Sequence, residues 1–262
     1  MYYWNNKQER KAKAIAHDKE MSTKYSPEIK ASIDNTLIYQ TNQIGIVCQT
    51  KSGKQEFPIN KWKDFSEDTK YHVVQKDSVS TLLFPQLQGK ICVLNFASFK
   101  NPGGMFLNGS SAQEESLCLE SFLYNVLKEF PDFYDYNKSH LNKGMYLDRA
   151  LYSPNIIFSR NKQIKSVDVL TCAAPNYSVA LKYNNFTKED NQKALESRIN
   201  FVKSILEVNH VDVAILGAWG CGVFKQDPAN VANLWKQNGV PVKTAVFAIP
   251  DKPTFNIFKS II

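Results

Sequence analysis

The sequence has no hydrophobic run that approaches the roughly 20 apolar residues needed to span a bilayer. Its first seven residues, Met1-Tyr2-Tyr3-Trp4-Asn5-Asn6-Lys7, also lack the apolar core of a secretory signal peptide. A membrane or secreted protein is therefore not expected. The 262 residues are 43% hydrophobic and 22% charged, as in ordinary globular proteins. We expect a soluble, intracellular, cytoplasmic chain, with the nucleus as an alternative in a eukaryote.

Cysteine and histidine are scarce and scattered. The five cysteines are odd in number and show no CxxC spacing, which argues against a disulfide framework or a zinc site. They are Cys48, Cys92, Cys118, Cys172 and Cys221. No cluster of His, Asp and Glu with metal-ligand spacing is present; the histidines are His17, His72, His140 and His210, and all lie outside the two loops considered below. We therefore expect no metal and no cofactor.

The sequence shows no dense basic cluster interleaved with aromatic residues, the usual footprint of nucleic-acid binding. The chain is nevertheless basic, with a net charge of +7 and a pI near 9.0. This charge favours a polyanionic or phosphate-rich ligand, although a lysine-rich surface without a specific partner is the simpler explanation. A basic α/β nucleic-acid-binding protein stays open as an alternative, but no dedicated nucleic-acid or membrane partner is expected.

The hydrophobic pattern changes near residue 80. Residues 1–80 are expected to form a mostly helical accessory region. Its expected helices are 7–21 and 26–33, and its short strands are 36–40, 44–49 and 71–75. Residues 81–262 alternate β-rich apolar runs with helical patterns, which is typical of an α/β sheet covered on both faces. There we expect strands over 90–96, 155–158, 167–171, 211–216 and 244–249, and helices over 112–130, 188–208, 228–238 and from 254 onward.

Two loops after expected strands are rich in glycine, and ligands of open α/β sheets bind at the carboxyl ends of strands. The first loop contains Gly103 and Gly104, which let a backbone approach a ligand closely. The helix that follows carries Glu114 and Glu115 in its first turn, as candidates for acid-base chemistry. The alternative is a capping box starting at Ser111, in which Glu114 only returns to the backbone amide of the helix cap.

The second loop contains Gly217, Gly220 and Gly222 between an apolar strand and a capped helix. Free amides in such a loop suit the oxygens of a diphosphate. The spacing matches neither the GxGxxG fingerprint nor a GxxxxGK[ST] loop. Trp219 and Phe224 are expected to form apolar walls for a ribose or a base. A glycine-rich turn without a ligand is the alternative.

Three segments of the chain carry a family resemblance. They are Asn95-Phe96-Ala97-Ser98 with Asn101-Pro102-Gly103-Gly104 and Gln113-Glu114-Glu115; Thr171-Cys172-Ala173-Ala174-Pro175-Asn176; and Gly217-Ala218-Trp219-Gly220-Cys221-Gly222-Val223-Phe224. With them the chain resembles the microbial-type poly(ADP-ribose) glycohydrolases over about residues 81–258. The resemblance implies an α/β fold of the macrodomain type, a mixed β-sheet sandwiched between helices, with a mostly helical N-terminal extension.

The resemblance also implies an activity and a site. The activity is that of an ADP-ribose glycohydrolase, which cleaves O-glycosidic ribose linkages of poly(ADP-ribose) or of ADP-ribosylated targets. Glu115 corresponds to the catalytic acid and base, and Glu114 to the carboxylate that holds ribose hydroxyls. The implied substrate-binding residues are Asn95, Ala97, Ser98, Asn101, Gly103, Gly104, Gln113, Gly217, Ala218, Trp219, Gly220, Cys221, Gly222, Val223 and Phe224, the last eight forming the diphosphate loop.

This assignment fits the chemistry. Cleavage at the ribose anomeric carbon needs a proton for the leaving oxygen and stabilisation of an oxocarbenium-like centre. One carboxyl group can donate that proton and then activate water.

One position departs from the family pattern. The third glycine of the hallmark triple-glycine loop is Met105 here, and its side chain is expected to narrow the ribose pocket, shift substrate choice or weaken activity. A catalytically weak ADP-ribose-binding protein therefore stays open as an alternative. We expect a monomer whose partners are ADP-ribose or poly(ADP-ribose) and ADP-ribosylated proteins.

Overall fold

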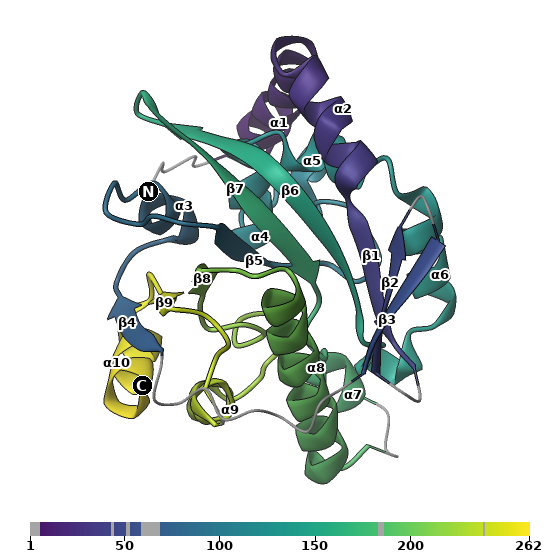
Figure 1. Ribbon diagram of the computed structural model, residues 1–262, viewed down its shortest axis with the longest axis vertical. Helices are drawn as coiled ribbons and strands as arrows, with labels where there is room; N and C mark the ends of the chain where they lie inside the picture. Colours follow the sequence, from purple (N-terminus) through teal and green to yellow (C-terminus); the bar gives the residue numbers. More distant parts are fainter. Residues whose placement is uncertain (1–5, 43–44, 51–52, 59–68, 183–185, 238) are drawn as a thin grey trace.

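The centre of the protein is a nine-stranded mixed sheet with the order β3-β2-β1-β6-β7-β5-β8-β9-β4 (Figure 1). The computed structural model describes residues 6–42, 45–50, 53–58, 69–182, 186–237 and 239–262. The strands are β1 (Leu37–Thr41), β2 (Gly45–Thr50), β3 (Gly53–Pro58), β4 (Lys70–Val74), β5 (Ile91–Phe96), β6 (Arg149–Arg160), β7 (Gln163–Cys172), β8 (Val213–Leu216) and β9 (Thr244–Ala248). From β7 to β4 all neighbours are parallel, and from β3 to β7 all are antiparallel.

Helices cover both faces of this sheet. The helices are α1 (Lys7–Lys24), α2 (Ser26–Asn35), α3 (Ser78–Leu82), α4 (Gln113–Leu119), α5 (Leu123–Leu127), α6 (Pro131–Ser139), α7 (Tyr177–Ala180), α8 (Lys188–Val208), α9 (Pro228–Lys236) and α10 (Lys252–Ile261), with short 3-10 turns η1 (Phe106–Asn108) and η2 (Asn142–Gly144). In the part of the chain that the structure describes, no helix is long and apolar enough to cross a membrane.

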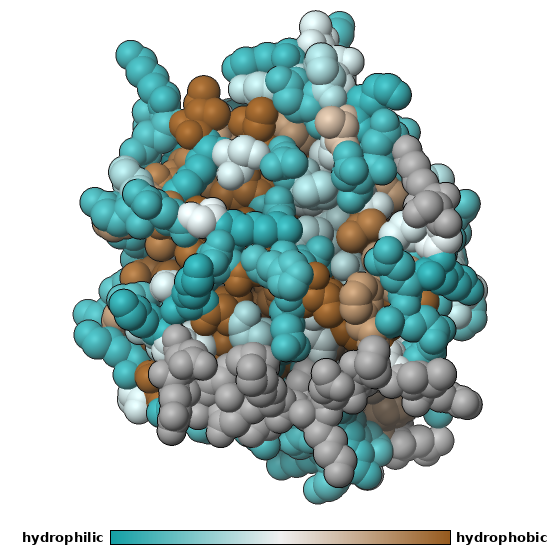
Figure 2. All heavy atoms as spheres, viewed as in Figure 1, coloured by the Kyte–Doolittle hydropathy of each residue, from teal (hydrophilic) through white to brown (hydrophobic). Residues whose placement is uncertain are grey.

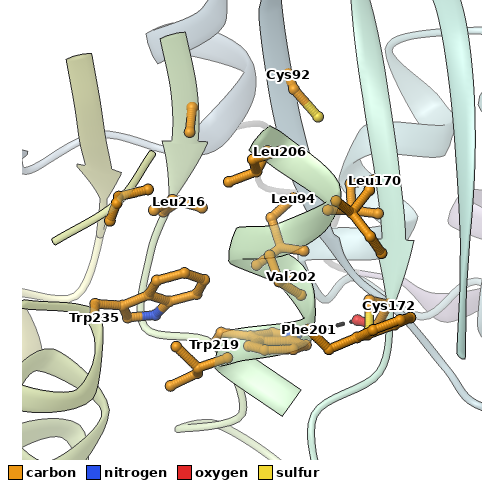
Figure 3. Packing of buried hydrophobic residues seen from close by; sticks show 14 of the residues in the cluster. Cys92, Leu94, Leu170, Cys172, Phe201, Val202, Leu206, Leu216, Trp219 and Trp235 are labelled. Atoms are coloured by element: carbon orange, nitrogen blue, oxygen red, sulfur yellow. Dashed lines mark hydrogen bonds between the residues drawn. The ribbon is translucent and has the colours of Figure 1, made fainter. Parts of the chain in front are cut away.

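The central strands are buried on both sides because alternate residues enter two different cores. In β5, Ile91 and Val93 pack into the cluster formed with α1 to α6, whereas Cys92 and Leu94 face the cluster formed with α8, α9 and α10. Figure 3 shows Leu94 beside Val202 and Leu206 of α8 in the second cluster. On the surface, hydrophilic side chains cover much of the face seen in Figure 2, with hydrophobic patches between them. The expected macrodomain-like sandwich is confirmed.

Most of the expected elements are present. Helix α8 has the predicted bounds because Thr187 and Asp190 form a capping box at its start. The helix predicted over 112–130 is wrong: α4 and α5 are separate, because Ser121 leaves the helix and forms a β-bridge with Phe158. β3, α3, α6 and α7 had not been predicted. Residue 44 of the strand expected over 44–49 and residue 238 of the helix expected over 228–238 lie outside the described residues.

The first eighty residues are less helical than expected. They supply α1 and α2 but also strands β1 to β4, and β1 pairs with β6 while β4 pairs with β9. The sheet therefore runs across the boundary proposed at residue 80. Short strands with many polar residues give a weak hydrophobic pattern, and their long-range pairing is what places them in the sheet.

Candidate active site

The two glycine-rich loops meet at one edge of the sheet. Strands β5, β7 and β8 are parallel neighbours, so their carboxyl ends lie together, and the loops that start at residues 97, 173 and 217 leave from this edge. The loop after β5 passes through η1 and returns to the sheet as α4. This topology places the first turn of α4, with both candidate carboxylates, above the end of β5.

Glu114 is buried with its carboxylate turned toward the end of β5. Its side chain is 3% exposed. Oε1 accepts a hydrogen bond of 3.1 Å from Nδ2 of Asn95, and Oε2 accepts one of 2.6 Å from the amide of Ser98. Burial raises the pKa of Glu114 to about 8, partly offset by these hydrogen bonds, and the neighbouring Glu115 charge raises it further. In the ligand-free protein this carboxyl therefore holds its proton at neutral pH.

The loop between β5 and α4, residues 97–112, is called the catalytic loop here for its expected role. Glu115 joins this loop to the start of α4. It is 7% exposed. Oε1 accepts a hydrogen bond of 2.9 Å from the amide of Met105, and Oε2 accepts one of 3.0 Å from the amide of Ala112. The capping contact predicted for Glu114 is therefore made by Glu115 instead, because the helix starts one residue later than the Ser111 cap assumed. Capping and chemistry are not alternatives here, since one carboxylate has free lone pairs for both.

Gly104 lies against both carboxylates. A Cβ on Gly104 would sit 2.6 Å from Oε1 of Glu115 and 3.0 Å from Oε2 of Glu114, so the two oxygens converge on one point. Gly103 and Gly104 both have positive φ, +63° and +62°, a region that favours glycine. At Gly103 the added atom would instead meet the ring of Tyr124 at 2.8 Å. Glycine at position 104 therefore lets the backbone lie against the two carboxylates, and its predicted approach to a ligand stays a prediction.

Two of the predicted substrate-binding residues brace the site. The amide group of Gln113 is used internally: Oε1 accepts from the amide of Phe96 at 2.8 Å, and Nε2 donates to the carbonyl of Leu94 at 2.9 Å and to Oγ of Ser78 at 3.2 Å. Asn95 has no exposed surface. These two side chains tie α4 to β5, so the structure makes them positioning residues, although Oδ1 of Asn95 has no partner among the described residues.

The residues between β5 and Gly103 shape the loop through their backbone. Ala97 is 2% exposed, so its methyl group packs inward, and its amide donates to the carbonyl of Asn95 at 2.9 Å. Oγ of Ser98 accepts from the amide of Asn101 at 3.2 Å, and the carbonyl of Asn101 accepts from the amide of Gly104 at 3.1 Å. These contacts fold the loop over Glu114.

Met105 does not distort the loop. Its φ is −112°, which any residue adopts, and its amide still donates to Glu115. The side chain is 46% exposed. A third glycine is therefore not needed for the backbone at this position, and Met105 adds a flexible apolar group at the surface of the site.

The three glycines of the second loop differ in how much space a side chain would have at each position. A Cβ on Gly217 would meet the carbonyl of Ala248 at 2.7 Å, and one on Gly220 would meet Ala174 and Gln226 at 2.9 Å. Both are required by packing. Gly222 has nothing within 4 Å. In the described part of the chain, the successive amides from Gly222 to residue 224 donate to no other protein group, which leaves them free for an anion.

The two aromatic residues expected to form walls beside this loop lie in different surroundings. The wall predicted for Trp219 is wrong, because its side chain has no exposed surface. The indole nitrogen donates to the carbonyl of Cys172 at 3.2 Å, and the ring packs beside Trp235 in the core (Figure 3). Phe224 is half-buried, with its ring edge-to-face against Tyr146 at 6.1 Å. It remains available at the site.

Other side chains of the loop differ in exposure. Val223 is 75% exposed, and Ala218 is half-buried. Burial raises the pKa of the Cys221 thiol to about 12, so this cysteine stays protonated and is a poor nucleophile.

Sequence reasoning missed the supports of the catalytic loop. Nδ2 of the buried Asn137 in α6 donates to the carbonyl of Phe99 at 2.9 Å. From the other side, Nε of Arg10 in α1 donates to the carbonyl of Gly109 at 2.6 Å. No motif marks these residues; the proline that starts α6 was the one signal that a helix stood there.

Comparisons with known proteins agree with this geometry. The sequence profile of the microbial-type PARG catalytic domain matches residues 7–161. The structure is similar to poly(ADP-ribose) glycohydrolase (PARG) from Thermomonospora curvata bound to the inhibitor ADP-HPD, with 26% identity and a TM-score of 0.79 over 97% of this chain and 100% of that chain. It is also similar to PARG from Deinococcus radiodurans in complex with ADP-ribose, with 26% identity and a TM-score of 0.73 over 89% of this chain and 96% of that chain. No curated protein sequence matches the chain.

Proposed function

The chain belongs to the microbial-type poly(ADP-ribose) glycohydrolase family, and from this premise we propose that Glu115 is its general acid and base and that Glu114 holds the ribose hydroxyls. Family membership makes the protein an ADP-ribose glycohydrolase, a glycoside hydrolase. The proposal concerns which residues perform the reaction. It rests on one observation, the convergence of the Glu114 and Glu115 oxygens on the backbone of Gly104.

The proposed reaction needs one proton transfer in each direction. The carboxyl group of Glu115 gives its proton to the leaving oxygen as the bond to the ribose anomeric carbon breaks. The resulting carboxylate then takes a proton from a water molecule, whose oxygen bonds to the same carbon, and Glu115 is restored. Glu114 accepts hydrogen bonds from ribose hydroxyls and fixes the sugar against Gly104. The free amides near Gly222 bind the diphosphate, which supplies binding energy away from the reacting bond.

A second assignment is favoured by one observation and differs in the proton donor. Burial raises the pKa of Glu114 to about 8, so this carboxyl group holds a proton at neutral pH before substrate binds. In that assignment Glu114 protonates the leaving oxygen and Glu115 stabilises the oxocarbenium-like centre. Hydrogen bonds do not separate the two residues, because both oxygens of each glutamate already accept one. We favour Glu115 because it is the residue that corresponds to the catalytic acid and base of the family.

Two matched variants separate the assignments. Glu115→Gln removes the transferable proton but keeps the shape of the side chain, and we expect a loss of turnover of about 100- to 10,000-fold or more. ADP-ribose affinity, measured by calorimetry, should stay within a few-fold. Glu114→Gln should weaken both ADP-ribose binding and turnover. If Glu115→Gln kept more than a tenth of the wild-type rate while Glu114→Gln abolished it, the second assignment would be correct.

A melting curve of each variant is the necessary control. A glutamine at position 115 can accept from only one of the two amides that Glu115 accepts from, those of Met105 and Ala112. We therefore expect a loss of about 1 kcal/mol in unfolding free energy for Glu115→Gln. A loss of turnover that followed only from unfolding at the assay temperature would leave catalysis unassigned to Glu115.

We extend the proposal to partners and assembly. The substrates are poly(ADP-ribose) and ADP-ribosylated proteins, and the protein acts as a monomer. Release of ADP-ribose from a polymer and from a mono-ADP-ribosylated protein, each followed separately, tests the substrate range. Light scattering during chromatography tests the assembly.

A further inference from the structure

A second polar cavity opens beside the active site. It has a volume of ≈ 370 Å³, within the range of small-molecule sites. Its walls come from the end of β1, the start of β6, the turn η2 and the helices α6 and α8. Polar and aromatic groups dominate the lining, among them Gln40, Tyr136, Tyr146, Asp148, Arg149 and Arg198.

The cavity lies at the same edge of the sheet as the catalytic loops. Arg149 begins β6 opposite Gln40 of β1, and the next residue of β6 pairs with Cys172 at the carboxyl end of β7. In the sheet β6 is two strands from β5, which corresponds to roughly 10 Å at the usual strand spacing. Tyr146 links the two places: it lines the cavity, stacks on Phe99 of the catalytic loop at 4.3 Å and contacts Phe224.

Arg149 has the properties of an anion-binding group. It is 8% exposed, and its guanidinium lies 4.0 Å from the ring centroid of Tyr136 and 5.0 Å from that of Phe133. Its Nε atom is buried without a hydrogen-bond partner, and no carboxylate in the described ranges forms an ion pair with it. A buried charge without a counter-charge is costly, so the site gains when an anion enters.

The second arginine of the cavity serves as an internal comparison. Nε of Arg198 donates to Oδ1 of Asp148 at 2.5 Å, and its other nitrogens donate to the carbonyls of Ala173 and Met145. Arg198 and Asp148 therefore neutralise each other. The uncompensated charge of this cavity is that of Arg149 alone, which matches one anionic group of a ligand.

We propose that the Arg149 cavity is an accessory subsite that binds a phosphate of the poly(ADP-ribose) chain beyond the unit being cleaved. This rests on the proposed function, because it assumes that the reacting unit lies at Glu115. The polymer carries phosphates at a fixed spacing from the reacting bond, whereas the sequence around a modified side chain of a protein has no anion at a fixed place.

The test compares a ligand that reaches the cavity with one that does not. KM is measured with poly(ADP-ribose), and Kd is measured with ADP-ribose, which fills only the reacting-unit site. We expect Arg149→Gln to raise KM for the polymer about tenfold while leaving the Kd of ADP-ribose within twofold. Arg149→Lys keeps the charge but loses the planar guanidinium group, so its KM for the polymer should lie between those of the wild type and Arg149→Gln.

A second pair of variants avoids the buried arginine, whose loss could harm folding. Ala194 is half-exposed on α8 and lines the cavity. Ala194→Glu places a negative charge there and should also raise KM for the polymer several-fold, whereas the isosteric Ala194→Gln should not. Both proteins should bind ADP-ribose like the wild type.

The outcomes separate this proposal from the proposed function. If wild-type protein failed to cleave the polymer, the proposed function would fail. If the wild type cleaved it but the Arg149 and Ala194 variants kept wild-type KM, the subsite would be refuted. Equal losses for polymer and ADP-ribose would make Arg149 a structural residue. A KM effect with a mono-ADP-ribosylated protein and none with the polymer would assign the cavity to the protein target instead.

Discussion

The two glycine-rich loops look alike in sequence but differ in what their glycines do. In the first loop, Gly103 and Gly104 adopt positive φ, and a side chain at Gly104 would collide with the carboxylates of Glu114 and Glu115. In the second loop, Gly217 and Gly220 are constrained by the packing of the fold, and Gly222 alone faces open space. In the first loop a glycine therefore lies against the carboxylates of the candidate site, whereas in the second loop most of the glycines lie against packed residues of the fold.

A glycine-rich motif in a sequence does not show whether its glycines are needed for folding or for ligand binding, and the structure separates these two effects. Where an added Cβ meets protein atoms, a substitution changes folding or the carboxylate geometry. Where it meets nothing, as at Gly222, a substitution can act only on the local backbone or on whatever binds there. Variants in the two loops should consequently fail in different measurements.

The largest effect should come from Gly104→Ala. The added Cβ lies 2.6 Å from Oε1 of Glu115, and the positive φ adds strain of about 1–2 kcal/mol. Displacement of the carboxylates should lower turnover about 100-fold. Gly103→Ala is the matched control, since it has the same φ but meets Tyr124 and Cys118. Equal rates for the two variants would remove the special role of Gly104.

In the second loop the expected effect is on affinity. Gly222→Val should weaken ADP-ribose binding at least about tenfold, or roughly 1.4 kcal/mol, and leave the melting temperature nearly unchanged. Gly220→Val should instead lower the melting temperature, because its side chain would meet Ala174 and Gln226 at 2.9 Å and φ is +78°. Calorimetry and melting curves of both proteins decide the comparison. An unchanged affinity in folded Gly222→Val protein would make the loop a turn without ligand.

A pH-dependent effect on stability is expected from Glu114, in the helix that follows the first loop. The pKa of Glu114 is about 8 in the folded protein against an ordinary value of 4.5. The folded state then holds a proton that the unfolded state has released, so this contribution to stability is full below pH 4.5 and is lost as pH rises toward 8. Relative to Glu114→Gln, wild-type unfolding free energy should fall by up to about 1.4 kcal/mol per pH unit in that window. Parallel pH profiles of the two proteins in urea titrations would contradict the buried, neutral carboxyl.

The smallest effect is expected from Met105→Gly, which restores the family's third glycine. The backbone at Met105 already has negative φ, and its amide already donates to Glu115. We expect turnover and ADP-ribose affinity to change by no more than about threefold, with a stability loss of about 0.5–1 kcal/mol from added chain entropy. Steady-state kinetics with the polymer measures this. A rise in turnover of ten-fold or more would revive the hypothesis that methionine makes this protein a weak enzyme.

The sequence located the site better than it assigned roles within it. Glu114, Glu115 and both glycine loops are recognisable because their spacing along the chain is local. The internal contacts of Gln113 and Trp219 were not predicted. The sequence does not show whether an amide or an indole side chain contacts a ligand or the protein interior. The break between α4 and α5 depends on Ser121 meeting Phe158, a contact between distant segments that no local pattern contains.

The residues that hold the catalytic loop in place could not be predicted from the sequence either. Asn137 and Arg10 reach the catalytic loop from α6 and α1, and Arg149 faces its cavity only because β1, β6 and α8 meet there. Each of these depends on tertiary packing, which overrides local propensity.

The parallel pairing of β4 with β9 has a consequence for how the protein reaches its fold. Residues 70–74 lie beside residues 244–248, so this pair closes a loop that contains both glycine-rich loops and both glutamates of the candidate site. Contacts between such distant segments slow folding, because loop closure costs entropy before any pairing is gained. During synthesis β4 must wait as an unpaired strand until the last part of the chain emerges. Its outward-facing Lys70 and His72 are the kind of polar residues that discourage a waiting strand from pairing with another molecule.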